Sequence, residues 1–352
     1  MGNLSQPPVV PIRSVAAAPL STPGAVPRLL LGVFLTLAAA ALVACGGGPD
    51  DAAPNTDGGG TPAAEDPAVS DAVAPAVRVV ATNVHTAWLA DRIGGDPVAV
   101  ESLMPAGADP GSFIPEPERI VELASPEVDL VLAHGADYET WMQIASLPED
   151  KVHTLTDGLD LLVLHGRTHS HGPGGEHSHV GQDPRTFTDP ALVAEQGRAV
   201  LALLTAAAPP LAAELDARGT ALQGELTALA EAFAAVGEGI AAAPIRLAQN
   251  HPSFHYLARR LGAPIETFDL NPNRPPADSE VAAVAAWIDG AGGRHALLWD
   301  RTPAPEVVSA LPETLEHRTL DPLDGSTGGD YDYLGQARAN LQTLQKLVDG
   351  GP

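Results

Sequence analysis

The sequence is poor in cysteine, in aromatic residues and in positive charge. One cysteine among 352 residues excludes an intramolecular disulfide and a cysteine-based zinc finger. Aromatic residues make up 4% of the chain, which argues against a stacking or sugar-binding surface. Lys and Arg number 19 against 44 Asp and Glu, a formal net charge of −25. Because phosphate contacts need clustered basic side chains, we expect no nucleic-acid partner, and the negative field favours cations instead.

The first 44 residues have the features of an export signal. Residues 1–28 contain positive but no negative charge, and an apolar run follows from Leu29 to Ala44. At 16 residues this run is short for a membrane span, which needs about 20, and it fits a signal peptide. It ends in Leu-Val-Ala-Cys-Gly, which resembles a bacterial lipoprotein cleavage box with Cys45 as the lipidated residue. The alternative is an ordinary export signal followed by a chance cysteine.

The segment after Cys45 differs in composition from the rest of the chain. It consists mainly of Gly, Pro, Ala, Asp and Thr. Such a stretch cannot bury enough surface to offset the entropy of ordering, so we predict a flexible tether. The expected organisation is a signal peptide (1–44), the tether (45–76), a first α/β lobe (77–207), a linking helix (208–240) and a second α/β lobe (241–352).

Strand-like and helix-like segments alternate along both lobes. We predict strands at Val77–Ala81, Val98–Leu103, Val128–Ala133, Ile245–Gln249, Ile265–Asp269 and Ala296–Asp300. We predict helices at Ala87–Ile93, Glu116–Ala124, Ser253–Leu261 and Ala277–Ile288, and two longer helical stretches at about 189–207 and 211–236. The alternation indicates a parallel sheet in each lobe. The expected fold class is α/β, with two Rossmann-like lobes joined by a long α-helix and a metal cleft between the lobes.

Three histidines and one aspartate follow predicted strands. His85 follows the first strand, His134 the third, His251 the strand Ile245–Gln249, and Asp321 the short run Arg318–Leu320. Ligands of open α/β sheets bind at the carboxyl ends of the strands. Three imidazoles and a carboxylate are a suitable donor set for tetrahedral Zn²⁺.

A second group of histidines lies close together in the sequence. The stretch HGRTHSHGPGGEHSH is rich in Gly and Pro, which predicts a loop. Neutral imidazole is a good ligand for Zn²⁺ or Cu²⁺, so the loop is a candidate metal collector or sensor. Ordering a flexible loop costs entropy, and we expect it to hold metal more weakly than a rigid site. Its histidines are His165, His169, His171, His177 and His179.

An ordered series of motifs covers residues 77–349. The segments are ATNVHTAWLADRIGGD, GADPGSFIPEP, LVLAHGADYETWM, QDPRTFTDPAL, HPSFHYLARRLG, and LDPLDG with YDYLGQARANLQTL. In this order, with a His-rich loop between the third and the fourth, they resemble the zinc and manganese substrate-binding lipoproteins of bacterial ABC importers. The resemblance implies two lobes, a long linking helix and metal ligands between the lobes.

The match is incomplete at the metal ligands. The resemblance places ligands at Gly111, Arg185, His251 and Asp321, and only the last two carry metal-binding side chains. Arginine stays protonated and cannot ligate a cation. Two histidines have been gained on the same rim of the first lobe, which suggests that the site has moved. The hypothesis is a relocated site made of His85, His134, His251 and Asp321.

Two other arrangements stay open. Metal could be held mainly by the His-rich loop. Alternatively, the cleft has lost its metal and binds an anionic or chelated ligand, with Arg185 either paired with Asp321 or gripping that ligand.

The features together predict an extracytoplasmic protein that captures Zn²⁺ and delivers it to an ABC permease. Mn²⁺ is less favoured because His251, rather than a carboxylate, fills the third ligand position. We expect a monomer held by its lipid anchor at the extracytoplasmic face of the cell membrane. The chain contains no HExxH and no GxSxG motif, so we predict no enzyme activity. A non-transport surface or adhesin lipoprotein is a further alternative.

Overall fold

A computed structural model describes residues 75–109, 112–164, 168–170, 176–178 and 181–351. Contacts divide the chain into residues 1–69 and residues 70–352, and every described residue belongs to the second unit. The predicted signal peptide, Cys45, nearly all of the predicted tether and Gly111 lie outside the described residues.

The first lobe is built on a four-stranded parallel sheet. Its strands are β1 (Val77–Ala81), β2 (Val98–Ser102), β3 (Leu130–Ala133) and β4 (Val152–Thr154), in the order β2-β1-β3-β4. β1 and β3 are almost wholly buried, as expected for central strands covered on both faces. The sheet is connected by α1 (Val84–Gly94), α2 (Pro117–Glu122) and the 3₁₀ turn η1 (Thr140–Gln143).

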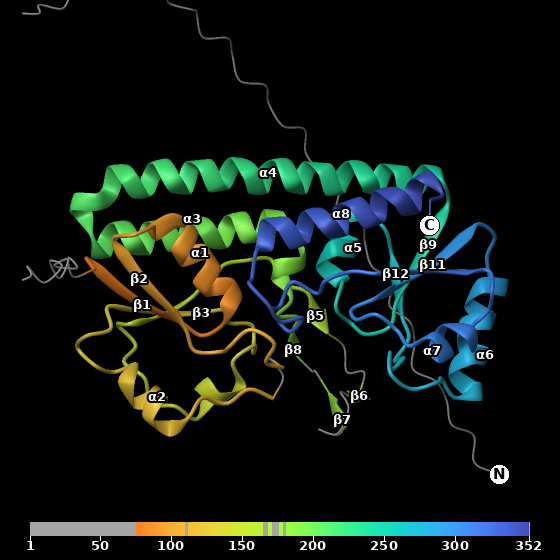
Figure 1. Ribbon diagram of the computed structural model, residues 1–352, viewed down its shortest axis with the longest axis horizontal. Helices are drawn as coiled ribbons and strands as arrows, with labels where there is room; N and C mark the ends of the chain where they lie inside the picture. Colours follow the sequence, from red (N-terminus) through yellow and green to blue (C-terminus); the bar gives the residue numbers. More distant parts are fainter. Residues whose placement is uncertain (1–74, 110–111, 165–167, 171–175, 179–180, 352) are drawn as a thin grey trace, which may run out of the picture. The chain divides into compact units, whose positions relative to one another are not determined.

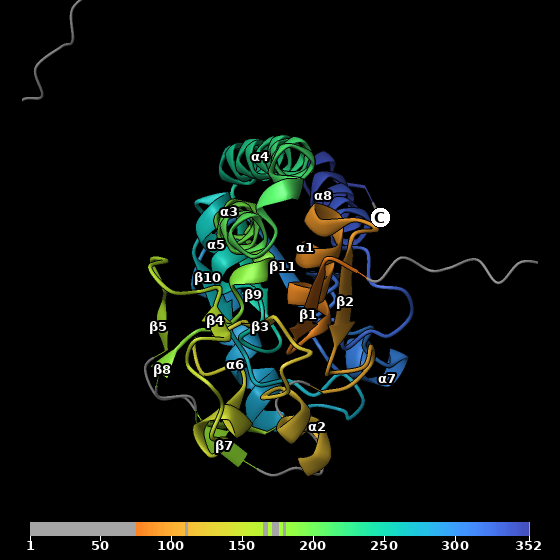
Figure 2. The same cartoon turned by 90° about the vertical axis from the view of Figure 1, so that its left-hand side faces the viewer.

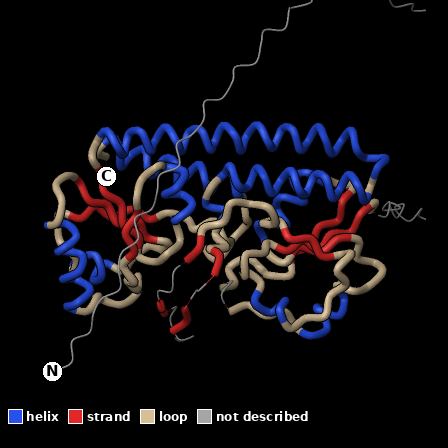
Figure 3. The backbone as a smooth tube through the Cα atoms, turned by 180° about the vertical axis from the view of Figure 1, so that it is seen from behind, coloured by secondary structure: helices blue, strands red, loops and turns tan. Residues whose placement is uncertain are grey.

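The second lobe repeats this topology. Its strands are β9 (Ile245–Gln249), β10 (Ile265–Thr267), β11 (Arg294–Trp299) and β12 (Leu315–Thr319), parallel and in the order β10-β9-β11-β12. Its connections are α5 (His255–Leu261), α6 (Asp278–Asp289) and α7 (Pro305–Ser309). Figure 3 shows the two sets of strands as separate groups. The predicted α/β class with two parallel-sheet lobes is confirmed.

One long helix contacts both lobes. α4 (Ala212–Ala242) packs on α1 and α3 (Pro190–Ala207) at one end, and on α5, β9 and α8 (Tyr333–Asp349) at the other. Figures 1 and 2 both show α4 running beside α3 and α8. Its buried side chains recur every three to seven residues, at Leu215, Leu222, Leu226, Leu229 and Phe233. At 31 residues the helix is roughly 46 Å long, so the predicted long helix is present, and it extends beyond the helical stretch expected at about 211–236.

Local sequence signals explain where the two helices nearest the site begin. Asn83 caps α1, because its side chain accepts a hydrogen bond from Thr86 N at 3.0 Å. Asp189 caps α3 in the same way, accepting from Ala191 N at 3.0 Å, and Pro190 occupies the first helical position. Asn83 lies two residues before His85, and Asp189 follows the segment that carries Asp183 and Arg185, so both caps fix the course of the chain beside the site.

The hydrophobic core divides into three clusters. The main cluster runs from Val77 in β1 through α4 to Leu347 in α8, so it joins the two lobes beneath the long helix. A smaller cluster lies on the other face of the first sheet, around Leu123 and Trp141. A third lies on the corresponding face of the second sheet, around Val284 and Trp299.

The His-rich stretch is not simply a loop. The backbones of β6 (Thr168–Ser170) and β7 (Glu176–Ser178) pair antiparallel, with His169 opposite His177. This hairpin lies between β5 (Val163–Leu164) and β8 (Gly181–Gln182), which also pair. His165, His171 and His179 lie outside the described residues. Among the residues with described structure, no helix is both long and apolar enough to cross a membrane.

Candidate functional site

His85 lies in the first turn of α1, one turn after the end of β1, and is 1% exposed. Its Nε2 is 3.0 Å from Gln196 Oε1, and its Nδ1 is 3.2 Å from the Tyr331 hydroxyl. The Gln196 amide nitrogen donates to Thr186 Oγ1, which turns the amide oxygen towards His85. The two ring nitrogens of His85 are thus held between Gln196 and the Tyr331 hydroxyl, which itself donates to the Leu323 carbonyl at 2.8 Å.

His134 follows β3 directly and is fully buried. Its Nε2 lies 2.5 Å from the carbonyl oxygen of Pro184, so it donates to that carbonyl, while Nδ1 is buried with no hydrogen-bond partner. The next residue, Gly135, has φ +91°, and a Cβ there would lie 2.1 Å from Thr154 Cγ2. Only glycine therefore allows the chain to turn away from β4 at this point.

Glu139 holds this strand end in place and is 8% exposed. Its carboxylate accepts from the backbone N–H groups of His134 at 2.8 Å and Gly135 at 3.0 Å, and from the Thr82 hydroxyl at 2.5 Å. Burial raises the pKa of Glu139, and these hydrogen bonds oppose that rise. Glu139 thus ties the ends of β1 and β3 together beneath the two histidines.

The His85 and His134 rings lie together, with their centroids 5.9 Å apart. Phe187 packs against both, while Tyr331 contacts His85 and Tyr138 contacts His134. Burial, with a smaller effect from His134, lowers the pKa of His85 to about 3. Burial also lowers the pKa of His134 to about 4, despite the hydrogen bond to Pro184. Both imidazoles are therefore neutral at pH 7.

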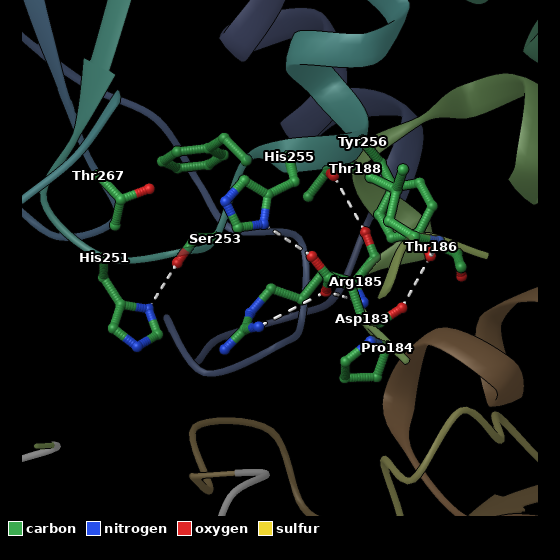
Figure 4. Close-up of polar contacts among 12 residues, drawn as sticks. Asp183, Pro184, Arg185, Thr186, Thr188, His251, Ser253, His255, Tyr256 and Thr267 are labelled. Carbon is green, nitrogen blue, oxygen red and sulfur yellow. Dashed lines mark hydrogen bonds and ion pairs between the residues drawn. The ribbon is translucent and has the colours of Figure 1, made fainter. Parts of the chain in front are cut away.

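His251 lies two residues beyond the end of β9 and is 7% exposed. Its Nδ1 is 3.0 Å from Ser253 Oγ and 3.6 Å from Asp300 Oδ2. Ser253 in turn donates to the Asp300 carboxylate at 3.1 Å, and Asp300 follows β11. These contacts orient the ring on the edge formed by the carboxyl ends of the second sheet, as Figure 4 shows for His251 and Ser253.

Asp321 lies on the loop after β12, as predicted. One carboxylate oxygen accepts from Leu323 N at 2.7 Å, and the other from Thr327 Oγ1 at 3.0 Å and Gln336 Nε2 at 3.2 Å. The Asn340 side-chain amide makes two hydrogen bonds with the backbone of Asp321. It donates to the Asp321 carbonyl oxygen and accepts from the Asp321 N–H. The carboxylate is thus firmly positioned by protein donors.

Arg185 lies on the segment that enters the 3₁₀ turn η3 (Thr186–Thr188), and its side chain is 15% exposed. Its Nη1 is 3.5 Å from Asp183 Oδ1 and makes no hydrogen bond. Pairing of Arg185 with Asp321 was one of two possibilities left open for this residue, and the observed ion pair is with Asp183 instead. Arg185 and Asp321 both act electrostatically on Asp324, which shows that the three charges lie in one neighbourhood.

Asp183 was not singled out from the sequence, yet it connects several charged groups. It is fully buried, and its Oδ2 is 2.9 Å from His255 Nδ1. Burial alone would raise the pKa of Asp183, but the hydrogen bond from His255 and the charge of Arg185 lower it overall. Figure 4 shows Arg185 and His255 converging on this carboxylate from different elements. The QDPRTFTDPAL motif contains Asp183, but no spacing rule indicated a partner in α5.

The structure brings together some of the predicted ligands and not others. His85 and His134 are neighbours, while His251 and Asp321 are each held by groups of the second lobe. Within the part of the chain that the structure describes, no three His, Cys, Asp or Glu side chains are grouped to hold a metal ion. The four predicted residues are therefore not assembled into a single site in this structure.

Comparison with known proteins places the chain in a family. The family model described as zinc-uptake complex component A, periplasmic, matches residues 79–347. Zinc-binding lipoprotein AdcA of Streptococcus pneumoniae is 23% identical over 288 residues, or 78% of this chain. The chain spans only about half of AdcA, 56% of its length. Metal ABC transporter substrate-binding lipoprotein SsaB of Streptococcus sanguinis is 31% identical over 101 residues, 26% of this chain and 32% of that protein.

The fold is also found in solved structures. The metal-dependent lipoprotein YcdH of Bacillus subtilis superposes with a TM-score of 0.63 and 17% sequence identity. The alignment covers 78% of this chain and 98% of YcdH, so the likeness extends over both lobes. With the family model matching residues 79–347 and the two-lobed fold in place, the chain belongs to the family of zinc-uptake complex component A proteins.

Proposed function

We propose that the chain is the extracytoplasmic substrate-binding component of an ABC importer for a transition metal. The family match supports this role. The observation that carries it is the pair of neutral imidazoles at the strand ends of the first lobe, His85 and His134. In His134, Nε2 is held by the Pro184 carbonyl and Nδ1 is buried without a hydrogen-bond partner, while in His85, Nε2 is held by Gln196 and Nδ1 lies against the Tyr331 hydroxyl. Metal-binding histidines have this arrangement, in which an outer hydrogen bond fixes the tautomer.

The ligand set that we propose is the relocated one, His85, His134, His251 and Asp321. Tyr331 packs against the His85 ring, and Tyr138 packs against the His134 ring. Capture would therefore require these tyrosines to give way, while the loops carrying His251 and Asp321 approach the histidine pair. Each histidine would keep its hydrogen bond to the protein in this process, so the ring orientation that presents a nitrogen to the metal would be preserved.

Zn²⁺ is the first candidate metal and Mn²⁺ the second. Three imidazoles and one carboxylate match the ligand preference of Zn²⁺, whereas hard cations such as Mg²⁺ and Ca²⁺ prefer oxygen ligands. The mechanism is binding and release with no covalent step, so the chain is not an enzyme. The permease of the importer is the partner to which the metal would pass.

The N-terminal features complete the proposal. Residues 1–44 would be removed as a signal peptide, Cys45 would carry the lipid, and residues 45–76 would tether the body to the extracytoplasmic face of the cell membrane. We propose a monomer. The His-rich segment 165–179 would collect metal without forming the tight site itself.

Calorimetry with ZnCl₂ tests this proposal on the intact protein and on a variant that lacks residues 165–179. We expect one tight zinc site in both, with additional weak sites only in the intact protein. A variant with His134→Ala should lose at least a hundredfold in affinity at the tight site. If this substitution left zinc affinity unchanged, the assignment of His134 as a ligand would be wrong. If tight binding vanished with residues 165–179, metal would be held by the His-rich segment.

A second candidate substrate rests on Arg185. Its mostly buried guanidinium fixes a positive charge close to Asp183 and Asp324. A fixed positive charge opposes a bare dication and favours a ligand that brings negative charge, such as a metal chelate. Titration with zinc citrate in place of ZnCl₂ separates the two candidates. Tighter binding of the citrate complex, lost on Arg185→Gln, would favour the chelate.

A further inference from the structure

The two lobes differ in how well they cover their outer sheet faces. Both sheets have the same strand order, and in each lobe the second and third connections cover the face that points away from α4. In the second lobe this cover is α6, with 12 residues, and α7. In the first lobe it is α2, with only 6 residues, and η1. Figures 1 and 2 both show α2 on the far side of the first sheet from α4.

The thin cover leaves apolar side chains exposed. Of the large hydrophobic residues that are exposed in the described chain, three lie here, namely Ile114 (65%), Val121 (73%) and Ile144 (86%). Together with Ile120, Ala124 and Trp141 they line a groove of about 390 Å³. The corresponding face of the second lobe has no such residue among its described positions. Because the topology is shared, the exposed groove is not a requirement of the fold.

The rim of the groove is acidic. Glu116 and Glu118 are exposed on either side of Pro117, which lines the groove. The ion-paired group of Glu122, Arg119 and Glu101 lines a separate pocket and is not part of this rim. An acidic rim repels the anionic surface of a bacterial membrane, and it repels an identical rim on a second copy of the chain. It attracts a segment that carries an apolar side chain between Lys or Arg residues.

We propose that this groove, defined by Ile114, Ile120, Val121, Ala124, Trp141 and Ile144, is the docking surface for a basic, apolar segment of the importer's permease. The inference rests on the proposed function, because that function supplies the permease as partner. The groove also includes a residue of the connection that follows β2 in the first lobe. Ile114 lies on the connection that leaves the carboxyl end of β2, and His85 and His134 lie at the same end of β1 and β3. Docking would thus contact the segment that borders the site.

The test compares groove variants with a matched surface variant. Ile144→Glu and Val121→Glu place a charge in the groove, and Glu118→Lys reverses the rim. Val163→Glu is the control, because Val163 is also a large exposed hydrophobic residue, at 59%, and lies on β5 outside the groove. Binding to the importer's permease in lipid nanodiscs is measured by surface plasmon resonance. Zinc affinity and thermal midpoint are measured on the same samples.

We expect Ile144→Glu and Val121→Glu to weaken permease binding at least tenfold, and Glu118→Lys at least threefold. Val163→Glu should stay within twofold, and all four variants should keep zinc affinity and thermal midpoint. The inference is overturned if the wild type binds the permease and Ile144→Glu binds equally well, or if the wild type binds zinc but no permease. It is also overturned if Ile144→Glu instead abolishes self-association or binding to anionic vesicles. Groove-dependent permease binding without any metal affinity would refute the proposed function and leave the docking surface standing.

Discussion

The carboxylate of Asp183 and the imidazole Nδ1 of His255 are 2.9 Å apart, and this contact joins the segment before η3 to the first residue of α5. Two further contacts run beside it. The Tyr256 hydroxyl donates to the Asp183 carbonyl at 2.8 Å, and Arg260 forms a two-pronged ion pair with Asp189. These contacts form a polar seam, made of Asp183 and Asp189 on one side and His255, Tyr256 and Arg260 of α5 on the other. The seam supplements the apolar packing of α4 against α5.

Replacing Asp183 with Asn should destabilise the protein by about 2–3 kcal/mol, measured by urea unfolding at pH 7. The substitution removes the charge that His255 and Arg185 share, and it leaves the mostly buried Arg185 guanidinium without a counter-charge. Because the folded-state pKa of Asp183 is lowered, its contribution is present above the unfolded pKa of about 4 and is lost as the pH falls through the folded value.

Asp160→Asn is the matched control for this prediction. Asp160 is also an aspartate paired with an arginine, Arg259, at 3.5 Å, but its side chain is 99% exposed. Exposed ion pairs contribute little, so we expect a change below about 0.5 kcal/mol. Equal effects of the two substitutions would show that the buried seam adds nothing to stability.

Much of the fold follows from local patterns in the sequence. The β-branched run Val77–Ala81 and the segment Ile245–Gln249 are strands with the predicted bounds. Period-3.6 apolar spacing predicted α4, although its C-terminal end lies beyond the expected 236, at Ala242. Strand β12 was recognised only as a short run, because four consecutive polar residues follow Leu315 and give a weak strand signal at the sheet edge.

The site was less predictable, because its contacts join residues far apart in the chain. The strand-end rule placed His85 and His134 on the same edge, and they are neighbours. It could not indicate that Tyr331 would pack on His85, since 246 positions separate them. Nor could it show that Arg185 would pair with Asp183, because the carboxylates of Asp183 and Asp321 are equally suitable ion-pair partners for a guanidinium.

Acidification should lower the free energy of unfolding, because the buried pair His85 and His134 resists protonation in the folded state. Burial lowers the folded-state pKa of His85 to about 3 and that of His134 to about 4, whereas an unfolded histidine titrates near 6.5. Below pH 6.5 the unfolded state therefore binds more protons than the folded state, and stability falls as the pH decreases. At pH 5 we expect a loss of about 2 kcal/mol for each histidine relative to pH 7, measured by urea unfolding in metal-free buffer.

The contribution of the pair can be isolated by substitution. His134→Gln removes one of the histidines whose pKa is lowered by burial, so the slope of stability against pH between 5 and 6.5 should become less steep. Identical slopes in His134→Gln and the wild type would assign the acid sensitivity to other groups.

The packing of α4 on α5 can be tested at two glycines of the same helix. A Cβ at Gly237 would lie 2.0 Å from the carbonyl oxygen of Leu261, so Gly237→Ala must push α5 away. We expect a loss of about 3 kcal/mol in the free energy of unfolding. A Cβ at Gly224 would meet nothing within 4 Å, so Gly224→Ala should stabilise α4 by about 0.5–1 kcal/mol. Equal urea midpoints for the two variants would show that α5 is not held against α4.

Arg185→His should tighten zinc binding at least tenfold, measured by calorimetry with ZnCl₂ at pH 7.5. The guanidinium places a fixed positive charge beside Asp183 and near Asp324, and it cannot ligate a cation. A neutral imidazole removes that repulsion and supplies a lone pair, while Asp183 keeps its hydrogen bond with His255. Arg185→Lys retains the charge and serves as the control, with affinity expected within threefold of the wild type. If Arg185→His and Arg185→Lys bound zinc equally, the charge at this position would not govern metal capture, and the metal would bind away from Arg185.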